Sequence, residues 1–428
     1  MRWLKHLTAL LVVASILIST AAPLVLAQSN TCNAFIDRVT AQLATACANT
    51  EVNQVCYGFE PIMAAFVEPV DEDLQFEEIG DKASLTDVLS ITTMPFNNRA
   101  QEWGVAYARG YANLSAALAN EYPAIYFIVG DTLVFNEVAA DDALILPEEP
   151  LVVTTANAAD LLSFPPGFGD RTSQTVGRAA ASQTLRADAV SEDGDFVRVS
   201  YVHELNEFAR SSTAWIALAD LTASTDVSAL PVITIDSRTP LQEFSFIASN
   251  AAPGCSNLPL SQVLLHGPGN IESEFFVNGL NVRLFSTVAF QFPTGSGQRS
   301  NMRIIPLTGN VFLPDPEAKD TFSRGIRVPA GQFIDVPLIF DNEIGKYVIA
   351  ASVYDNFGQF KRNWDTSFGR GQTRINPGMI FRLLAWEKLP GNLLNYILTI
   401  IKIILASGVG GVIPIFEGGQ KPPLIFGN

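Results

Sequence analysis

Four cysteines, Cys32, Cys47, Cys56 and Cys255, are the side chains of this sequence whose spacing suggests chemistry most directly. In an oxidising compartment they would form disulfides, and four cysteines allow three connectivities. Cys32 and Cys47 lie at the two ends of one expected helix, about 22 Å apart, whereas a disulfide needs Cα atoms within about 7 Å. Cys47 and Cys56 are separated by a short turn, so we expect this pair to form and Cys32 then to pair with Cys255; free buried thiols are the alternative.

Beyond the first 27 residues the sequence has two histidines, His203 and His266, that could act as a general base. His203 lies in an expected strand and His266 directly precedes a turn, and both positions favour a structural hydrogen-bonded role. The sequence contains no HExxH, GxSxG, P-loop or GxGxxG motif. We therefore expect no catalytic residues, no cofactor and no metal site. A carboxylate pair of a carbohydrate-active hydrolase leaves no fixed spacing and is kept as a weaker alternative.

Residues 1–27 have the composition of a secretory signal peptide. Arg2 and Lys5 supply the positive start, LTALLVVASILIST supplies the apolar core, and Val25 and Ala27 are the small residues before the expected cleavage point. An uncleaved membrane anchor at the N-terminus is the alternative. We therefore expect an exported protein that is extracellular, periplasmic or associated with the cell envelope, where disulfides are permitted.

The chain is acidic, and removal of Arg2 and Lys5 with the signal peptide lowers its formal charge from −16 to −18. This charge argues against nucleic acid as a partner and disfavours anionic polymers, because both need clusters of Lys and Arg. Neutral glycans, peptides and cations are the favoured ligands. The densest acidic run lacks the Asp-x-Asp-x-Asp-Gly spacing of a calcium loop, so we interpret it as a solvated loop. The run contains Asp71, Glu72, Asp73, Glu77, Glu78 and Asp81.

Hydrophobic periodicity predicts a mainly β chain with a small N-terminal α+β domain. Phe35, Val39 and Leu43 recur at helical spacing after Cys32. The runs AIYFIV and TLVFNEV on either side of Gly130-Asp131 predict a β-hairpin. We assign residues 28–140 to this domain and interpret residues 141–150, which are acidic and contain proline, as a linker.

Residues 151–226 consist of short expected strands, and their turn motifs resemble those of bacterial SH3-like domains. The matching features are Pro165-Pro166-Gly167 after an early strand, Asp193-Gly194 before an aromatic residue, and Trp215-Ile216 in the closing strand. Leu162 and Phe196 stand where the family pattern has arginine and tryptophan. The resemblance implies a small barrel with Trp215 in its core and a hairpin turn at Asp193-Gly194.

Residues 227–370 form a further β-rich module. Asn278-Gly279 lies between two alternating apolar runs and predicts a β-hairpin, and Gly309-Asn310 and Ala330-Gly331 divide the next runs in the same way. The pattern resembles FecR-like extracytoplasmic domains, which implies a β-sandwich or barrel and, as an alternative function, a sensory or regulatory ectodomain. The matching residues are Asn278, Gly279, Val282, Leu284, Ser286 and Thr287.

Residues 371–428 are expected to hold a helix and a hydrophobic tail. The segment 393–416 is long enough to span a bilayer at about 20 residues, so a membrane contact is one interpretation. Lys402 and Pro414 within it favour an amphipathic helix packed on the body of the protein.

The candidate binding site is the loop formed by Phe164, Pro165, Pro166 and Phe168, because a turn of a small barrel displays aromatic side chains. The alternative is that Phe164 and Phe168 fold back and close the end of the barrel. These features predict an exported, non-catalytic protein of the cell envelope or surface that acts through binding or structural modules. A cell-wall or surface glycan or peptide is the expected partner.

Overall fold

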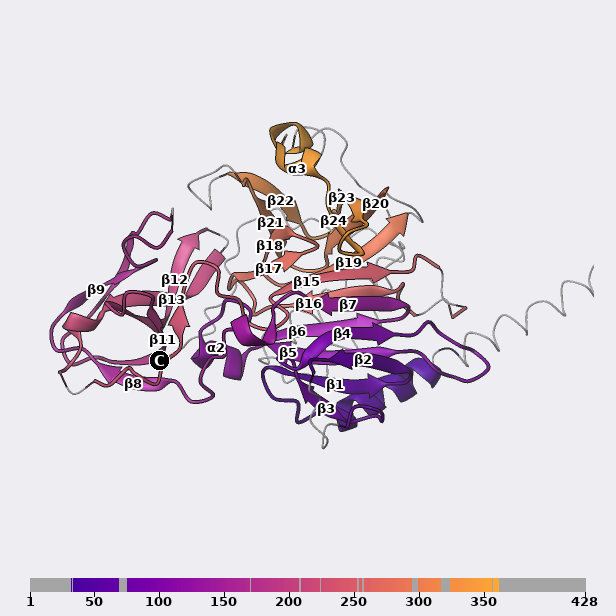
Figure 1. Cartoon of the computed structure of the whole chain (residues 1–428), viewed down its shortest axis with the longest axis horizontal. Coiled ribbons are helices and arrows are strands. Elements are labelled where there is room, and N and C mark those ends of the chain that lie inside the picture. Colours follow the sequence, from indigo (N-terminus) through magenta and orange to yellow (C-terminus); the bar gives the residue numbers. More distant parts are fainter. Residues whose placement is uncertain are drawn as a thin grey trace, which may run out of the picture.

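The computed structural model describes residues 32–361 except 33, 69–74, 170, 208, 224, 252–253, 256–257, 295–298, 317–323 and 356. The expected signal peptide, residues 71–73 of the acidic run and the C-terminal segment 371–428, including 393–416, lie outside the described residues. The described part is mainly β, as the periodicity predicted, and its strands form three sheets (Figure 1).

Two of the sheets pack face to face as a β-sandwich. In spatial order the first contains β24 (Lys346–Ile349), β23 (Ile334–Asp341), β20 (Arg299–Pro306), β19 (Thr287–Thr294), β16 (Gln262–His266), β6 (Ala124–Val129), β5 (Val105–Gly110), β1 (Gln54–Phe59) and β3 (Lys82–Ser84). The second contains β2 (Ile62–Phe66), β4 (Val88–Thr93), β7 (Thr132–Asn136), β15 (Glu243–Ala248), β17 (Ser273–Val277), β18 (Leu280–Leu284), β21 (Asn310–Pro314) and β22 (Gly325–Pro329). Their facing sides share one apolar core, in which the Tyr126 ring lies 6.3 Å from Phe244 and 5.9 Å from Phe275.

Both sheets combine strands from the two segments that the sequence analysis assigned to separate domains, 28–140 and 227–370. β6 pairs with β16, which places Ile128 opposite Val263, and β7 pairs with β15, which places Asn136 opposite Phe244. The division into an N-terminal α+β domain and a separate FecR-like module is therefore corrected to one sandwich with an insertion. Local patterns miss this pairing because each strand shows only its own alternation.

Turn signals in the sequence locate chain reversals but do not reveal which strands pair. The hairpin at Asn278-Gly279 is confirmed, since β17 and β18 are antiparallel neighbours and both turn residues have positive φ, 50° and 82°. The hairpin predicted at Gly130-Asp131 is wrong, because β6 and β7 belong to different sheets. Gly309-Asn310 and Ala330-Gly331 likewise carry the chain from one sheet to the other.

A helix at residues 34–46 covers the outer face of the nine-stranded sheet. Its buried residues Val39 and Leu43 join Phe127 of β6, whose side chain points away from the sandwich core. Two short α-helices are also described, α2 (Ala116–Glu121) and α3 (Ala351–Asp355). Among the residues that the structure describes, no helix has both the length and the hydrophobicity needed to cross a membrane.

Both predicted disulfides are present and fix the two ends of this helix. Cys32 bonds to Cys255 with the Cα atoms 5.7 Å apart, and Cys47 bonds to Cys56 with the Cα atoms 5.8 Å apart. All four cysteines are buried in the cluster beneath the helix. Disulfides of this kind indicate an oxidising environment outside the cytoplasm.

The third sheet is the inserted module, residues 151–233. It contains β10 (Thr175–Ala179), β9 (Ala159–Leu162), β13 (Ala209–Ala217), β12 (Phe196–Asn206), β11 (Thr184–Ser191), β14 (Val232–Ile233) and β8 (Leu151–Thr154). The short helix η1 (Ala140–Asp142) precedes the module in the chain, and η2 (Leu218–Asp220) follows β13. The turn at Asp193-Gly194 is as predicted. Trp215 is buried as expected, but it packs in a cluster shared with the sandwich and not in the module's own core. The module extends beyond the expected boundary at 226, because β14 pairs with β11. In Figure 1 the module stands beside the sandwich, with α2 between them.

Candidate functional site

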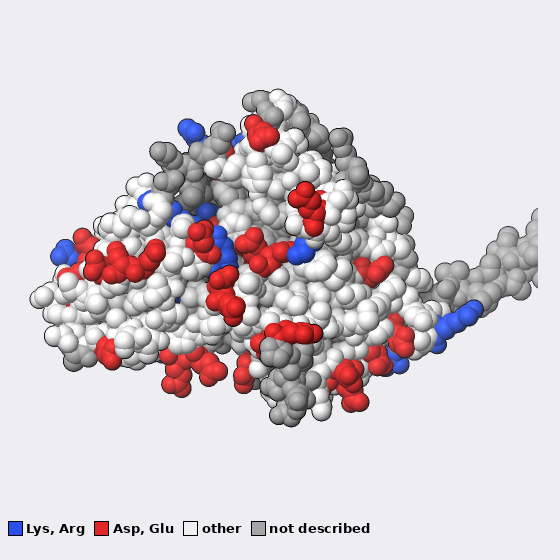
Figure 2. All heavy atoms as spheres, in the orientation of Figure 1, with Lys and Arg blue, Asp and Glu red and all other residues white. Residues whose placement is uncertain are grey.

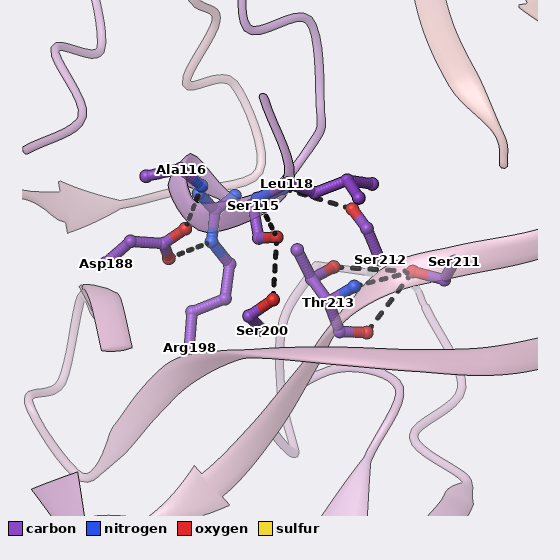
Figure 3. A network of polar contacts seen from close by, with 9 residues as sticks. All are labelled: Ser115, Ala116, Leu118, Asp188, Arg198, Ser200, Ser211, Ser212 and Thr213. Carbon is purple, nitrogen blue, oxygen red and sulfur yellow. Dashed lines mark hydrogen bonds and ion pairs between the residues drawn. The ribbon is translucent and has the colours of Figure 1, made fainter. Parts of the chain in front are cut away.

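A network of buried polar groups joins the inserted module to the sandwich (Figure 3). Oδ2 of Asp188 accepts a hydrogen bond from the backbone N–H of Ala116 at 2.7 Å, and Oδ1 accepts one from Nε of Arg198 at 2.7 Å. The backbone N–H of Ser115 donates to Oγ of Ser212 at 3.0 Å. Asp188 is 1% exposed, so these bonds form away from water and fix the position of α2 against β11, β12 and β13.

Apolar side chains surround this network and come from both sides of the junction. Trp215, Ala189 and Ile233 belong to the inserted module, whereas Leu114, Leu118 and Ile271 belong to the sandwich. The stretch 141–150, expected as a linker, does connect the two parts, but its Leu144 and Leu146 are buried in the same cluster. The junction is therefore a packed interface.

A cleft of about 130 Å³ opens along this junction. At about 30 Å³ for each molecule of liquid water, this volume corresponds to roughly four waters, which is enough for a carboxyl group or a similarly small part of a ligand. Both parts of the protein line it: Phe164, Phe168 and Arg171 from the inserted module, Glu272 and Glu274 from the sandwich, and Arg238 from the connection that returns to the sandwich.

The loop predicted as a binding site forms one wall of the cleft as a stack of rings. Phe164 stacks on Phe168 with centroids 6.2 Å apart, and Phe168 lies 5.8 Å from Trp215. Both phenylalanines are half-buried, Pro165 is buried and Pro166 is exposed. The loop is therefore neither fully displayed nor folded back into the barrel: neighbouring side chains hold its rings, and the rings line the cleft.

Two carboxylates on the sandwich side share one guanidinium. Nη2 of Arg283 on β18 lies 3.1 Å from Oε1 of Glu274, and Nη1 lies 3.7 Å from Oε2 of Glu272. Burial raises the pKa of Glu272 to about 7, because its attraction to Arg283 only partly offsets the loss of water. Burial alone would also raise the pKa of Glu274, but Arg283, Arg171 and a hydrogen bond from Asn281 outweigh it and lower the pKa to about 2.

The two histidines have structural hydrogen bonds. His203 lines the cleft, and its Nε2 lies 3.1 Å from the carbonyl oxygen of Thr213. Burial lowers the pKa of His203, and it lowers the pKa of His266 to about 4. Nδ1 of His266 lies 2.8 Å from Oγ1 of Thr287. Both therefore occupy strands as neutral side chains at pH 7, in the role that the sequence predicted.

Within the part of the chain that the structure describes, no group of three His, Cys, Asp or Glu side chains could hold a metal ion. The phenylalanine loop of this cleft was among the residues predicted from the sequence, whereas Arg171, Arg238, Glu272 and Glu274 were not. Comparison with models of protein families, with curated proteins and with solved structures found no match.

Proposed function

We propose that this chain is an exported, non-catalytic binding protein of the cell envelope or surface, and that the junction cleft is its ligand site. Phe164 and Phe168 carry this proposal, because the residues chosen from the sequence as a binding loop line a cleft that also contains charged groups from the sandwich. Aromatic and arginine side chains on a rigid framework are typical of recognition sites. The ligand is a glycan or peptide of the envelope.

Two further features support export and an envelope role. The disulfides fit an oxidising compartment, and the composition of residues 1–27 fits a secretory signal peptide. The turn motifs of residues 151–226 that resemble bacterial SH3-like domains support a binding role for the inserted module. The resemblance of the later strands to FecR-like domains is also compatible with an extracytoplasmic protein.

Glu272 and Glu274 are the residues that a hydrolase would use in this cleft. A glycosidase places its two carboxyl groups on either side of the scissile bond. Here Glu272 and Glu274 are two positions apart at the start of β17 and share Arg283, so they lie on the same wall of the cleft. This arrangement supports binding over turnover.

The proposal is tested with the secreted chain and isolated cell-wall material in a sedimentation assay. The variant Phe164→Ser/Phe168→Ser is expected to lose binding and, because both rings are half-buried, to melt several degrees lower while staying folded. The control Val152→Ser changes a 63% exposed side chain of the same module and should bind normally. Failure of the unmodified protein to bind any envelope fraction contradicts the proposal.

A further inference from the structure

Two arginines of the cleft, Arg171 and Arg238, have no carboxylate within ion-pair distance among the residues that the structure describes. Two neighbouring arginines are paired. Arg198 contacts Asp188 at 2.7 Å, and Arg283 pairs with Glu272 and Glu274. Arg171 and Arg238 are both half-buried, so each holds a positive charge partly removed from water, and the glutamates that act on them do so from beyond ion-pair distance.

Each of these two guanidinium groups lies against an aromatic ring. The guanidinium carbon is 4.7 Å from the centre of Phe164 for Arg171 and 4.4 Å from the centre of Phe276 for Arg238. Such stacking positions the planar group with its N–H donors along the edge, where a planar acceptor can bind the donors that are not already engaged. Nη1 of Arg238 donates to the carbonyl oxygens of Ile235 and Ser237 at 3.0 and 2.9 Å, which fixes its orientation further.

The electrostatic environment of Arg171 favours an anion. Burial is the main cause that lowers its pKa; Glu274 and Glu272 oppose this effect, whereas Arg283 and Arg238 add to it. Figure 2 shows Lys and Arg atoms gathered where the inserted module meets the sandwich, on a face that otherwise carries mainly acidic side chains. A negatively charged group between Arg171 and Arg238 would replace the lost water and compensate both charges.

We propose that Arg171 and Arg238 form an anion clamp that binds the carboxylate of a small ligand in this cleft. A carboxylate matches the fork of a guanidinium group, and the volume of the cleft admits a carboxyl group. The carboxylate can belong to a sugar acid or to the C-terminus of a peptide. This inference rests on the proposed function and refines its ligand: the overall acidity of the chain favoured neutral ligands, but three arginines and two glutamates line the cleft.

Titration calorimetry of the secreted chain with matched probes tests the clamp. Glucuronate is compared with glucose, and N-acetyl-dialanine is compared with its C-terminal amide. At least one acid is expected to bind about tenfold or more tightly than its neutral counterpart, because charge-assisted hydrogen bonds are lost in the latter. Binding should weaken as salt is added. The acid that binds identifies the source of the carboxylate; equal affinity within both pairs, or no binding of either acid, overturns the clamp.

Variants separate the clamp from general charge. Arg171→Gln and Arg238→Gln are each expected to weaken binding of the acid about tenfold or more. The control Arg178→Gln, whose side chain is 71% exposed in the same module, should stay within about twofold. If Arg171→Gln does not fold, Arg171→Lys keeps the charge and should bind with intermediate affinity. Folded variants that bind like the unmodified protein overturn the clamp.

The two proposals fail in different ways. Binding of glucuronate without binding to any envelope fraction contradicts the envelope function and leaves the clamp in place. Binding to cell-wall material that depends on Phe164 and Phe168 but is unchanged in Arg171→Gln contradicts the clamp and leaves the envelope function in place.

Discussion

The backbone N–H of Ala116 donates a 2.7 Å hydrogen bond to the carboxylate of Asp188, although the two residues lie 72 positions apart. Ala116 begins α2, and Asp188 lies in β11 of the inserted module. The same carboxylate pairs with Arg198, so one buried group satisfies the start of α2 and a guanidinium of the inserted module. The orientation of the cleft walls therefore depends on a polar contact in addition to apolar packing.

Asp188→Ala is expected to destabilise the protein by about 3–5 kcal/mol, because it leaves the Arg198 guanidinium buried and unpaired. The control Asp160→Ala removes an exposed carboxylate 3.9 Å from Arg178 and should cost less than about 1 kcal/mol. Urea unfolding of both variants provides the comparison. Similar losses for the two variants would show that the Asp188 contact is not a strong constraint.

Trp215→Ala is expected to cost about 3–5 kcal/mol, since the ring is 3% exposed and packs with residues of both parts of the protein. Val152→Ala, at a 63% exposed position, should change the stability by less than about 0.5 kcal/mol. The free energies of unfolding come from the same urea titration. A loss below about 1 kcal/mol at Trp215 would reject its assignment to the buried cluster at the junction.

Removal of the long disulfide should destabilise the protein more than removal of the short one. The cysteines of the two bonds are 223 and 9 positions apart, and the chain-entropy model gives stabilisations of about 5 and about 3 kcal/mol. The double variants Cys32→Ser/Cys255→Ser and Cys47→Ser/Cys56→Ser are compared in urea, and peptide mapping without reduction verifies the remaining bond. The reverse order of stability would contradict this account.

Glu272 should make the stability fall as the pH rises. Its pKa is raised from 4.5 to about 7 in the folded protein, so the folded state retains a proton that the unfolded chain releases between these two values. Glu272→Gln is therefore expected to match the unmodified protein near pH 5 and to exceed it near pH 8, by at most about 3 kcal/mol.

Glu274→Gln provides the opposite control. The pKa of Glu274 is lowered from 4.5 to about 2, so its charge stabilises the folded state above about pH 4.5 and this stabilisation is lost as the pH falls toward 2. This variant should be less stable than the unmodified protein at both pH values. Unfolding in urea near pH 5 and near pH 8 measures both variants, and parallel pH profiles for the two would reject the assignment.

Local features of the fold could be predicted because short-range physics determines them. The helical stripe of Val39 and Leu43, the tight turn at Asn278-Gly279 and the pairing of Cys47 with Cys56 each depend on nearby residues. The sheet partners could not, because an alternating strand fits equally well beside several neighbours. The turn at Gly130-Asp131 illustrates this point, since the same Gly-containing turn serves a hairpin or a passage between two packed sheets.

One ion pair of the site, Glu274 with Arg283, could nevertheless have been predicted from the sequence. A two-residue turn at Asn278-Gly279 fixes the register of β17 and β18, and that register places Glu274 directly opposite Arg283. An acidic and a basic residue in this cross-strand position predict an ion pair. Arg171 and Arg238 gave no comparable signal, because they come together only when the inserted module packs on the sandwich.

The Cys32–Cys255 bond closes residues 32–255 into a covalent ring, and every loop of the inserted module lies within that ring. A protease that cuts one of these loops opens the ring without releasing a fragment, because the two new ends stay connected through the disulfide and through the rest of the chain. The cut protein keeps both walls of the cleft on one covalently linked molecule. In a protease-rich setting, a single cut therefore separates the chain into two fragments only when this disulfide is also reduced.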